Sequence, residues 1–114
     1  MQSASSSSLC AANNCESGSV IDLSGQELCL EHYFVKCYER LDWVESIARS
    51  RRLDTDVASR AHALLRECAN QTLIVCLRHH PQPLDNLQRS RLLEIMLQCT
   101  DLQVQLRRPS LQLT

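Results

Sequence analysis

Hydrophobic and polar positions change their period along this chain, from an alternation near the N-terminus to a helical repeat further on. Between Cys10 and Leu30 two short runs, SVIDL and ELCL, are rich in strand-forming residues, and Ser24 and Gly25 lie between them. A serine and a glycine between two such runs are typical of a tight hairpin turn. The pattern therefore predicts a short β-hairpin before the first helix.

Three later segments repeat apolar residues every three or four positions, which is the period of an amphipathic helix. We expect helices over residues 30–50, 54–80 and 85–108. The positions predicted to face a shared core are Phe34, Cys37, Tyr38, Leu41, Val44 and Ala48, then Val57, Ala61, Leu64, Leu65, Cys68, Thr72 and Val75, then Leu92, Ile95, Met96, Cys99, Leu102 and Leu106.

The ends of these helices carry residues that suit helix termini. Asp54 is placed to cap the second helix, and Asp85 followed by Gln88 is a variant of the capping box. Pro81 and Pro83 separate the second helix from the third, because proline has no backbone N–H to donate. The fold class predicted is mainly α, a short zinc-bound β-hairpin followed by a three-helix bundle.

The composition agrees with a helical protein of modest size. The 114 residues include only 2 glycines and 3 prolines, and aromatic residues make up 4%. A chain of this length is expected to form one domain, here residues 9–109, with 9–33 as the zinc knuckle and hairpin. The serine-rich head, residues 1–8, and the tail, residues 110–114, are expected to lie outside it.

The charge balance argues against non-specific binding to nucleic acids or membranes. Twelve basic and 13 acidic residues leave a formal charge of −1, so a general positive field is missing. No apolar run approaches the roughly 20 residues of a membrane helix, and the first residues do not resemble a secretion signal. We expect a soluble, cytoplasmic protein.

Four residues near the N-terminus have the types and spacing of metal ligands. Cys10, Cys15, Cys29 and His32 follow the order Cys-x4-Cys-x13-Cys-x2-His. Two short-spaced pairs joined by a hairpin can supply the tetrahedral shell of a structural zinc ion. The alternative is a core cysteine at position 29 beside an incidental histidine, but Cys10 and Cys15 lie in the polar segment CAANNC, which has no core of its own.

This order of knuckle, hairpin and helix start resembles the treble-clef class of zinc fingers over residues 10 to about 50. The resemblance implies one structural zinc ion held by the same four residues. The first pair departs from the common pattern, because it is spaced by four residues rather than two and contains no glycine. Asn13 or Asn14 would then adopt the left-handed conformation.

The order CxxxxC followed by LCLEHYFVKCYERLD also looks like short uncharacterised bacterial zinc-finger proteins, some of which carry a PilZ-type domain further along. The PilZ signature for cyclic di-GMP is not present, because the segment DLSG, Asp22 to Gly25, has its glycine one position early. Binding of cyclic di-GMP is therefore not predicted.

Other cysteines and histidines could serve as ligands or nucleophiles. Cys37 could replace His32 as the fourth ligand, although its position favours core packing. Cys68, Cys76, His79 and His80 could form a second metal site or a Cys–His pair, but their spacing is not specific for either. Histidines at the end of a helix are more often partners of the helix dipole.

Several apolar residues remain after one core stripe is drawn on each helix. Trp43 and Ile47 on the first helix, and Leu93, Leu97 and Val104 on the third, are predicted to bind a protein partner or a second copy of the chain. Leu73 and Leu77 form a similar stripe on the second helix. A homodimer or a subunit of a larger assembly is expected.

The function predicted is a non-enzymatic, zinc-stabilised interaction or regulatory module. One alternative is a nucleic-acid-binding regulator that uses Arg49, Arg51 and Arg52 beside the finger. A second alternative is a thiol-based redox sensor that uses Cys76 or an oxidisable zinc thiolate. The glycine-rich phosphate loops and hydrolase motifs of common enzymes do not occur.

Overall fold

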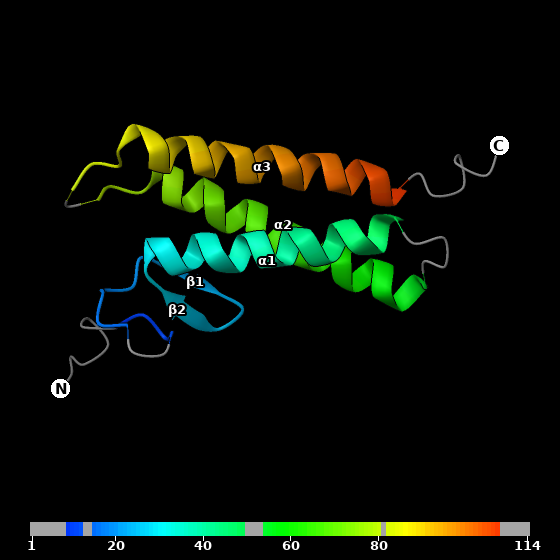
Figure 1. Cartoon of the computed structure of the whole chain (residues 1–114), viewed down its shortest axis with the longest axis horizontal. Helices are drawn as coiled ribbons and strands as arrows, with labels where there is room; N and C mark the ends of the chain where they lie inside the picture. The colour runs from blue at the N-terminus through cyan, green and yellow to red at the C-terminus, as the bar shows by residue number, and fades with distance from the viewer. Residues whose placement is uncertain (1–8, 13–14, 50–53, 81, 108–114) are drawn as a thin grey trace.

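The computed structural model of this chain describes residues 9–12, 15–49, 54–80 and 82–107. In chain order these contain β1 (Ile21–Leu23), β2 (Gln26–Leu28), α1 (Leu30–Arg49), α2 (Thr55–Leu77) and α3 (Asn86–Arg107). The three helices run side by side along the long axis of the molecule, and the hairpin lies against one end of the bundle (Figure 1). The fold is mainly helical with a hairpin before the helices, as the sequence pattern predicts. The predicted head and tail lie outside the described residues.

The hairpin is antiparallel, with Ile21 opposite Leu28 and Leu23 opposite Gln26. Its two turn residues both have positive φ, 54° at Ser24 and 84° at Gly25. Positive φ at both central positions is the conformation whose twist matches the two strands. Each strand has only three residues, fewer than the sequence runs indicate, because the chain leaves β2 at Cys29 to begin α1.

The core lies between the three helices, and each helix contributes a line of buried side chains. These are Leu30, Tyr33, Phe34, Cys37, Leu41 and Val44 from α1, Ala61, Leu65, Cys68, Thr72 and Val75 from α2, and Leu92, Ile95, Cys99, Leu102 and Leu106 from α3. Ala48, Val57, Leu64 and Met96, also predicted to face the core, are half-buried.

Tyr38 packs against the core at its edge, as predicted, but the fully buried tyrosine of α1 is Tyr33, which the sequence pattern did not assign to the core. Tyr33 is fully buried, whereas Tyr38 is only half-buried. The Tyr33 hydroxyl lies 2.6 Å from the Thr72 hydroxyl and donates to the Cys68 carbonyl at 3.2 Å. The Tyr38 hydroxyl instead donates to Glu94 at the surface, at 3.0 Å. Burial of a tyrosine requires a partner for its hydroxyl, and α2 provides one only for Tyr33.

The predicted helix caps are confirmed. The Asp54 carboxylate accepts the backbone N–H of Asp56 at 3.1 Å. At α3 the Asp85 carboxylate accepts the N–H of Gln88 at 2.7 Å, and the Gln88 side chain accepts the N–H of Asp85 at 2.9 Å. This reciprocal pair satisfies two backbone donors that the first turn leaves free.

The second helix ends at Leu77, before the predicted boundary at residue 80. Arg78 is extended, its N–H donates to the Ile74 carbonyl at 2.9 Å, and its guanidinium donates to the Val20 carbonyl in the hairpin. The His80 ring lies 2.9 Å from the Val75 carbonyl, which is the helix-end role predicted for it. None of the described helices has the length and apolarity that a bilayer crossing needs.

Polar side chains of α1 and α2 attach the hairpin to the bundle. Glu67 of α2 accepts hydrogen bonds from the N–H and the hydroxyl of Ser24, at 2.6 and 2.8 Å. Arg40 of α1 donates to the same carboxylate at 3.0 Å and to the Ser24 hydroxyl. Gln71 donates to the carbonyl of Asp22. These bonds fix how the hairpin, and with it the start of α1, sits on the bundle.

Candidate metal centre

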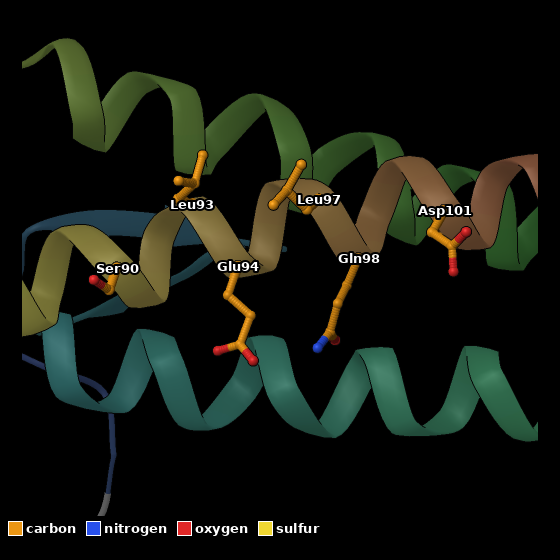
Figure 2. A pocket seen from close by; sticks show the side chains of 6 residues that line it. All are labelled: Ser90, Leu93, Glu94, Leu97, Gln98 and Asp101. Carbon is orange, nitrogen blue, oxygen red and sulfur yellow. The ribbon is translucent and has the colours of Figure 1, made fainter.

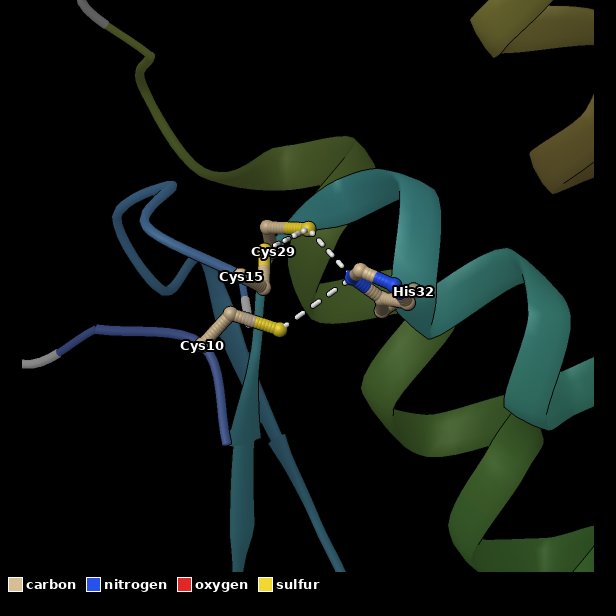
Figure 3. A group of neighbouring side chains, drawn as sticks. All are labelled: Cys10, Cys15, Cys29 and His32. Atoms are coloured by element: carbon tan, nitrogen blue, oxygen red, sulfur yellow. Dashed lines mark hydrogen bonds between the residues drawn. The ribbon is translucent and has the colours of Figure 1, made fainter. Parts of the chain in front are cut away.

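The four predicted ligands come from three segments that meet at the start of α1. Cys10 and Cys15 belong to the N-terminal loop, Cys29 directly follows β2, and His32 lies in the first turn of α1 (Figure 3). The Tyr33 N–H donates to the Cys29 carbonyl at 2.8 Å, so Cys29 directly precedes the first turn of α1 and accepts its first backbone hydrogen bond. His32 is therefore about one helical turn beyond Cys29 on the same side.

The N-terminal loop folds back on itself and docks on the hairpin. Leu9 pairs with Gly18 in an antiparallel bridge, and the Cys10 N–H donates to the Ser17 carbonyl at 2.9 Å. The Ala11 N–H then donates to the Glu27 carbonyl of β2 at 2.7 Å. These bonds hold the loop against β2 and bring the sulfur atoms of Cys10 and Cys15 close to Cys29. Asn13 and Asn14, one of which is expected to adopt the left-handed conformation, lie outside the described residues.

The distances among the four side chains suit a tetrahedral metal ion. His32 Nδ1 lies 3.4 Å from Cys10 Sγ and 3.2 Å from Cys29 Sγ. Cys15 Sγ lies 3.8 Å from Cys29 Sγ, and all four ligand atoms are within 4.8 Å of one another. Zinc bonds to sulfur and nitrogen at about 2.3 and 2.0–2.1 Å, which separates two sulfurs by about 3.8 Å and sulfur from nitrogen by about 3.6 Å. The donor set therefore fits such an ion.

The electrostatics of the two buried thiols point to the same conclusion. Burial raises the pKa of Cys10, but the backbone N–H groups of Cys29 and Ala12 outweigh it and lower the pKa to about 7. Burial raises the pKa of Cys29, and the neighbouring sulfurs of Cys10 and Cys15 raise it further. The thiol of Cys10 therefore loses its proton readily, and the neighbouring sulfurs oppose ionisation of Cys29. A divalent cation would supply the positive charge that several thiolates in contact require.

A metal ion held by all four side chains would have a closed site, because protein atoms would fill all four corners of its tetrahedron. Catalytic zinc sites keep a position for water or substrate, whereas structural sites do not. Cys10 and Cys29 are 6% and 7% exposed, so solvent has little access to their sulfurs. The arrangement can cross-link the loop, the hairpin and α1.

Cys37 does not replace His32 in the cluster. Its thiol is fully buried in the bundle, with its Sγ 3.1 Å from the Sγ of Cys68 on α2. Cys99 of α3 is fully buried as well. The hydrogen bond with Cys68, together with burial, raises the pKa of Cys37. Helical period predicted all three cysteines to be in the core, but the contact between Cys37 and Cys68 depends on how α1 and α2 are rotated and could not be read from the sequence.

The alternative of a second metal site or a Cys–His pair near the end of α2, which the sequence did not favour, does not assemble among the described residues. Cys76 is exposed and the structure gives it no hydrogen bond to His79 or His80. Partial burial raises the pKa of Cys76, which is the opposite of what a reactive thiolate needs. Cys68 belongs to the buried contact with Cys37 instead.

The residues predicted to bind partners have different surroundings. Trp43, Leu93, Leu97 and Val104 are exposed, as are Leu73 and Leu77, while Ile47 is half-buried and packs against the core. Among the basic residues suggested for nucleic acids, Arg49 donates to Glu45 at 2.9 Å. Arg51 and Arg52 lie outside the described residues.

No protein-family model, curated protein or solved structure matches this chain. The resemblance to zinc fingers therefore rests on the order and geometry of the three cysteines and one histidine.

Proposed function

We propose that this chain is a small zinc-stabilised protein-interaction module with no catalytic activity of its own. The observation that carries the proposal is the complete set of four ligand atoms within 4.8 Å of one another. Three thiols and one imidazole suit zinc, and a fully protein-ligated site stabilises structure rather than activating water. The free state of all seven cysteines suits a reducing compartment, where zinc thiolates persist.

When bound, zinc would join the N-terminal loop, the end of β2 and the first turn of α1. Glu67 and Arg40 attach the opposite end of the hairpin to α1 and α2. The hairpin is thus attached at two places, and it sets the direction in which α1 leaves the finger. In this proposal, the module presents the outer faces of the bundle in a fixed arrangement.

The outer faces carry the apolar residues that a partner would cover. Leu93 and Leu97 are 58% and 62% exposed, and Trp43 is 39% exposed. Large apolar side chains left in water along one helix mark interaction surfaces. A protein partner or a second copy of the chain would bury them.

Native mass spectrometry of the purified chain tests the proposal, because it reports bound metal and oligomeric state together. We expect one zinc per chain in the wild type and in the Cys76→Ser control, whose exposed thiol lies outside the cluster. Cys29→Ser should lose the metal. A folded wild-type chain that carries no metal after expression with zinc, and takes none up on titration, would overturn the proposal.

A further inference from the structure

The exposed leucines of α3 border a shallow hollow of about 410 Å³. Its lining residues are Ser90, Leu93, Glu94, Leu97, Gln98 and Asp101. Leu93 and Leu97 project to one side of the helix, whereas Glu94 and Gln98 reach towards α1 (Figure 2). Leu93 and Leu97 therefore form an apolar ridge, and Glu94 and Gln98 form a polar wall beside it.

A second hollow of about 480 Å³ continues from this wall into the space between α1 and α3. Tyr38, Asp42 and Glu45 line it from α1. From α3 it is lined by Glu94, Gln98, Asp101, Leu102 and Gln105. Because Glu94, Gln98 and Asp101 line both hollows, the two form one surface, which we call the α1–α3 groove.

The groove is acidic although the chain as a whole is nearly neutral. Four carboxylates line it, those of Asp42, Glu45, Glu94 and Asp101, and the lining residues that the structure describes include no lysine or arginine. The Tyr38 hydroxyl donates to Glu94 at 3.0 Å and the Gln105 amide donates to Asp101 at 2.9 Å. The donors to Glu94 and Asp101 are neutral and add no positive charge. Within the described ranges, Glu45 is the one groove carboxylate that is paired with a cation, Arg49.

This charge distribution disfavours a second copy of the chain as the occupant. In a two-fold dimer the same patch lies on both sides of the interface. Acidic side chains of one copy, such as Glu94 and Asp101, would then face acidic side chains of the other copy beside Leu93 and Leu97. Like charges facing each other at an interface oppose association.

We infer that the α1–α3 groove binds a basic amphipathic helix of a partner protein. Apolar side chains of that helix cover Leu93 and Leu97, and lysines or arginines on its flank meet Asp42, Glu94 and Asp101. Val104 is exposed as well, and it lies about 16 Å, or some three turns, beyond Leu93 along α3. An apolar surface of this length suits the binding of a partner helix. This inference rests on the proposed function, since it names the class of partner.

Binding of a synthetic peptide to the zinc-loaded full chain tests the inference. The probe is a fluorescent helical peptide of about 18 residues, or some five turns, with leucines along one face and lysines on its flanks. The control peptide replaces each lysine with glutamate. We expect the lysine peptide to bind at least about tenfold more tightly, with an affinity that falls as salt rises. Equal binding of the two peptides would overturn the inference.

Matched variants locate the binding surface. Asp42→Asn with Asp101→Asn should weaken the lysine peptide roughly fivefold, and Leu93→Ser with Leu97→Ser by about tenfold or more. Glu39→Gln and Leu77→Ser are the controls: Glu39 lies within 3.8 Å of Lys36 instead of lining the groove, and Leu77 is 78% exposed on α2. If the control variants weaken peptide binding equally, the peptide is attracted to the surface in general and does not bind in the groove, which would overturn the inference.

The oligomeric state separates this inference from the proposed function. If the zinc-loaded chain is a dimer and the double variant Leu93→Ser with Leu97→Ser dissociates it, the two leucines bind a second copy of the chain. That result would overturn the inference of a basic partner helix but would leave the proposed interaction module intact. A chain without zinc would instead remove the proposed function itself. All variants alter exposed or half-buried side chains, so unchanged zinc content and helicity would verify their folding.

Discussion

Glu67 of α2 accepts two hydrogen bonds from Ser24 at the hairpin turn, one from the backbone N–H at 2.6 Å and one from the hydroxyl at 2.8 Å. Arg40 of α1 donates to the same carboxylate at 3.0 Å. One side chain thus joins both helices to the turn, at the end of the hairpin away from the metal cluster. The charge of Glu67 is balanced by Arg40, so the carboxylate can be half-buried at this junction.

Replacing Glu67 should loosen the hairpin from the bundle. Glu67→Gln keeps the shape of the side chain but removes its charge and one acceptor for the Ser24 donors. We expect the zinc-loaded protein to lose about 1 kcal/mol of unfolding free energy, reduced from the usual value for charged hydrogen bonds by partial exposure. Urea denaturation measures this change in unfolding free energy, and Glu39→Gln on the surface of α1 is the control. Equal stability of the two variants would contradict the role assigned to Glu67.

The contribution of Glu67 should depend on pH. Burial raises the pKa of Glu67, but hydrogen bonds from Ser24 and Arg40 outweigh it, so the pKa is lowered in the folded protein. A lowered pKa gives stability that is complete above the unfolded value, about 4.3, and is lost as pH falls through the folded value. The stability difference between wild type and Glu67→Gln should therefore be constant near neutrality and shrink below about pH 4. Protonation of the metal ligands is common to both proteins and cancels in the difference.

Removal of the metal should release the knuckle and hairpin before the helices. Two strands of three residues are not stable alone in water, whereas a structural zinc ion contributes on the order of 10 kcal/mol. With a chelator present, hydrogen exchange at residues 10–30 should accelerate first, while amides near Leu65 and Cys99 in the bundle core stay protected. Simultaneous exchange of both regions would show that the bundle also depends on the metal.

The two glycines offer a matched test of the hairpin turn. Gly25 has φ of 84°, whereas the backbone of Gly18 is not in this region, and a Cβ added at either position meets nothing within 4 Å. Gly25→Ala should therefore cost about 1 kcal/mol through backbone strain alone. Gly18→Ala should change stability by less than about 0.5 kcal/mol. Thermal unfolding of the zinc-loaded proteins compares them, and equal costs would contradict the turn conformation.

The buried Tyr33 and Thr72 should behave as a coupled pair, because their hydroxyls lie 2.6 Å apart with no exposed surface. Tyr33→Phe leaves the Thr72 hydroxyl with one fewer partner and should cost about 1–2 kcal/mol. The double variant with Thr72→Val should cost less than the sum of the two single variants. A double-mutant cycle by urea unfolding measures the coupling, and additive costs would show that the two hydroxyls act independently.

Local features of the fold and the site could be predicted from neighbouring residues. The hairpin turn at Ser24 and Gly25, the Asp54 cap and the Asp85–Gln88 box each depend on backbone groups a few positions away. The grouping of Cys10, Cys15, Cys29 and His32 was also predicted, because ligand types and short spacings restrict where a metal can lie. These interactions repeat in any chain with the same local order, so the sequence alone determined them.

Relationships between helices were decided only by the tertiary structure. The burial of Tyr33 rather than Tyr38, the contact of Cys37 with Cys68, and the bonds from Ser24 to Glu67 all depend on how each helix is rotated about its axis. Helical period limits that rotation to a broad face, and packing of large side chains across the core selects one angle within it. The same rotation brings Asp42 and Glu45 of α1 opposite Glu94 and Asp101 of α3. The acidic groove therefore exists only after the helices have packed.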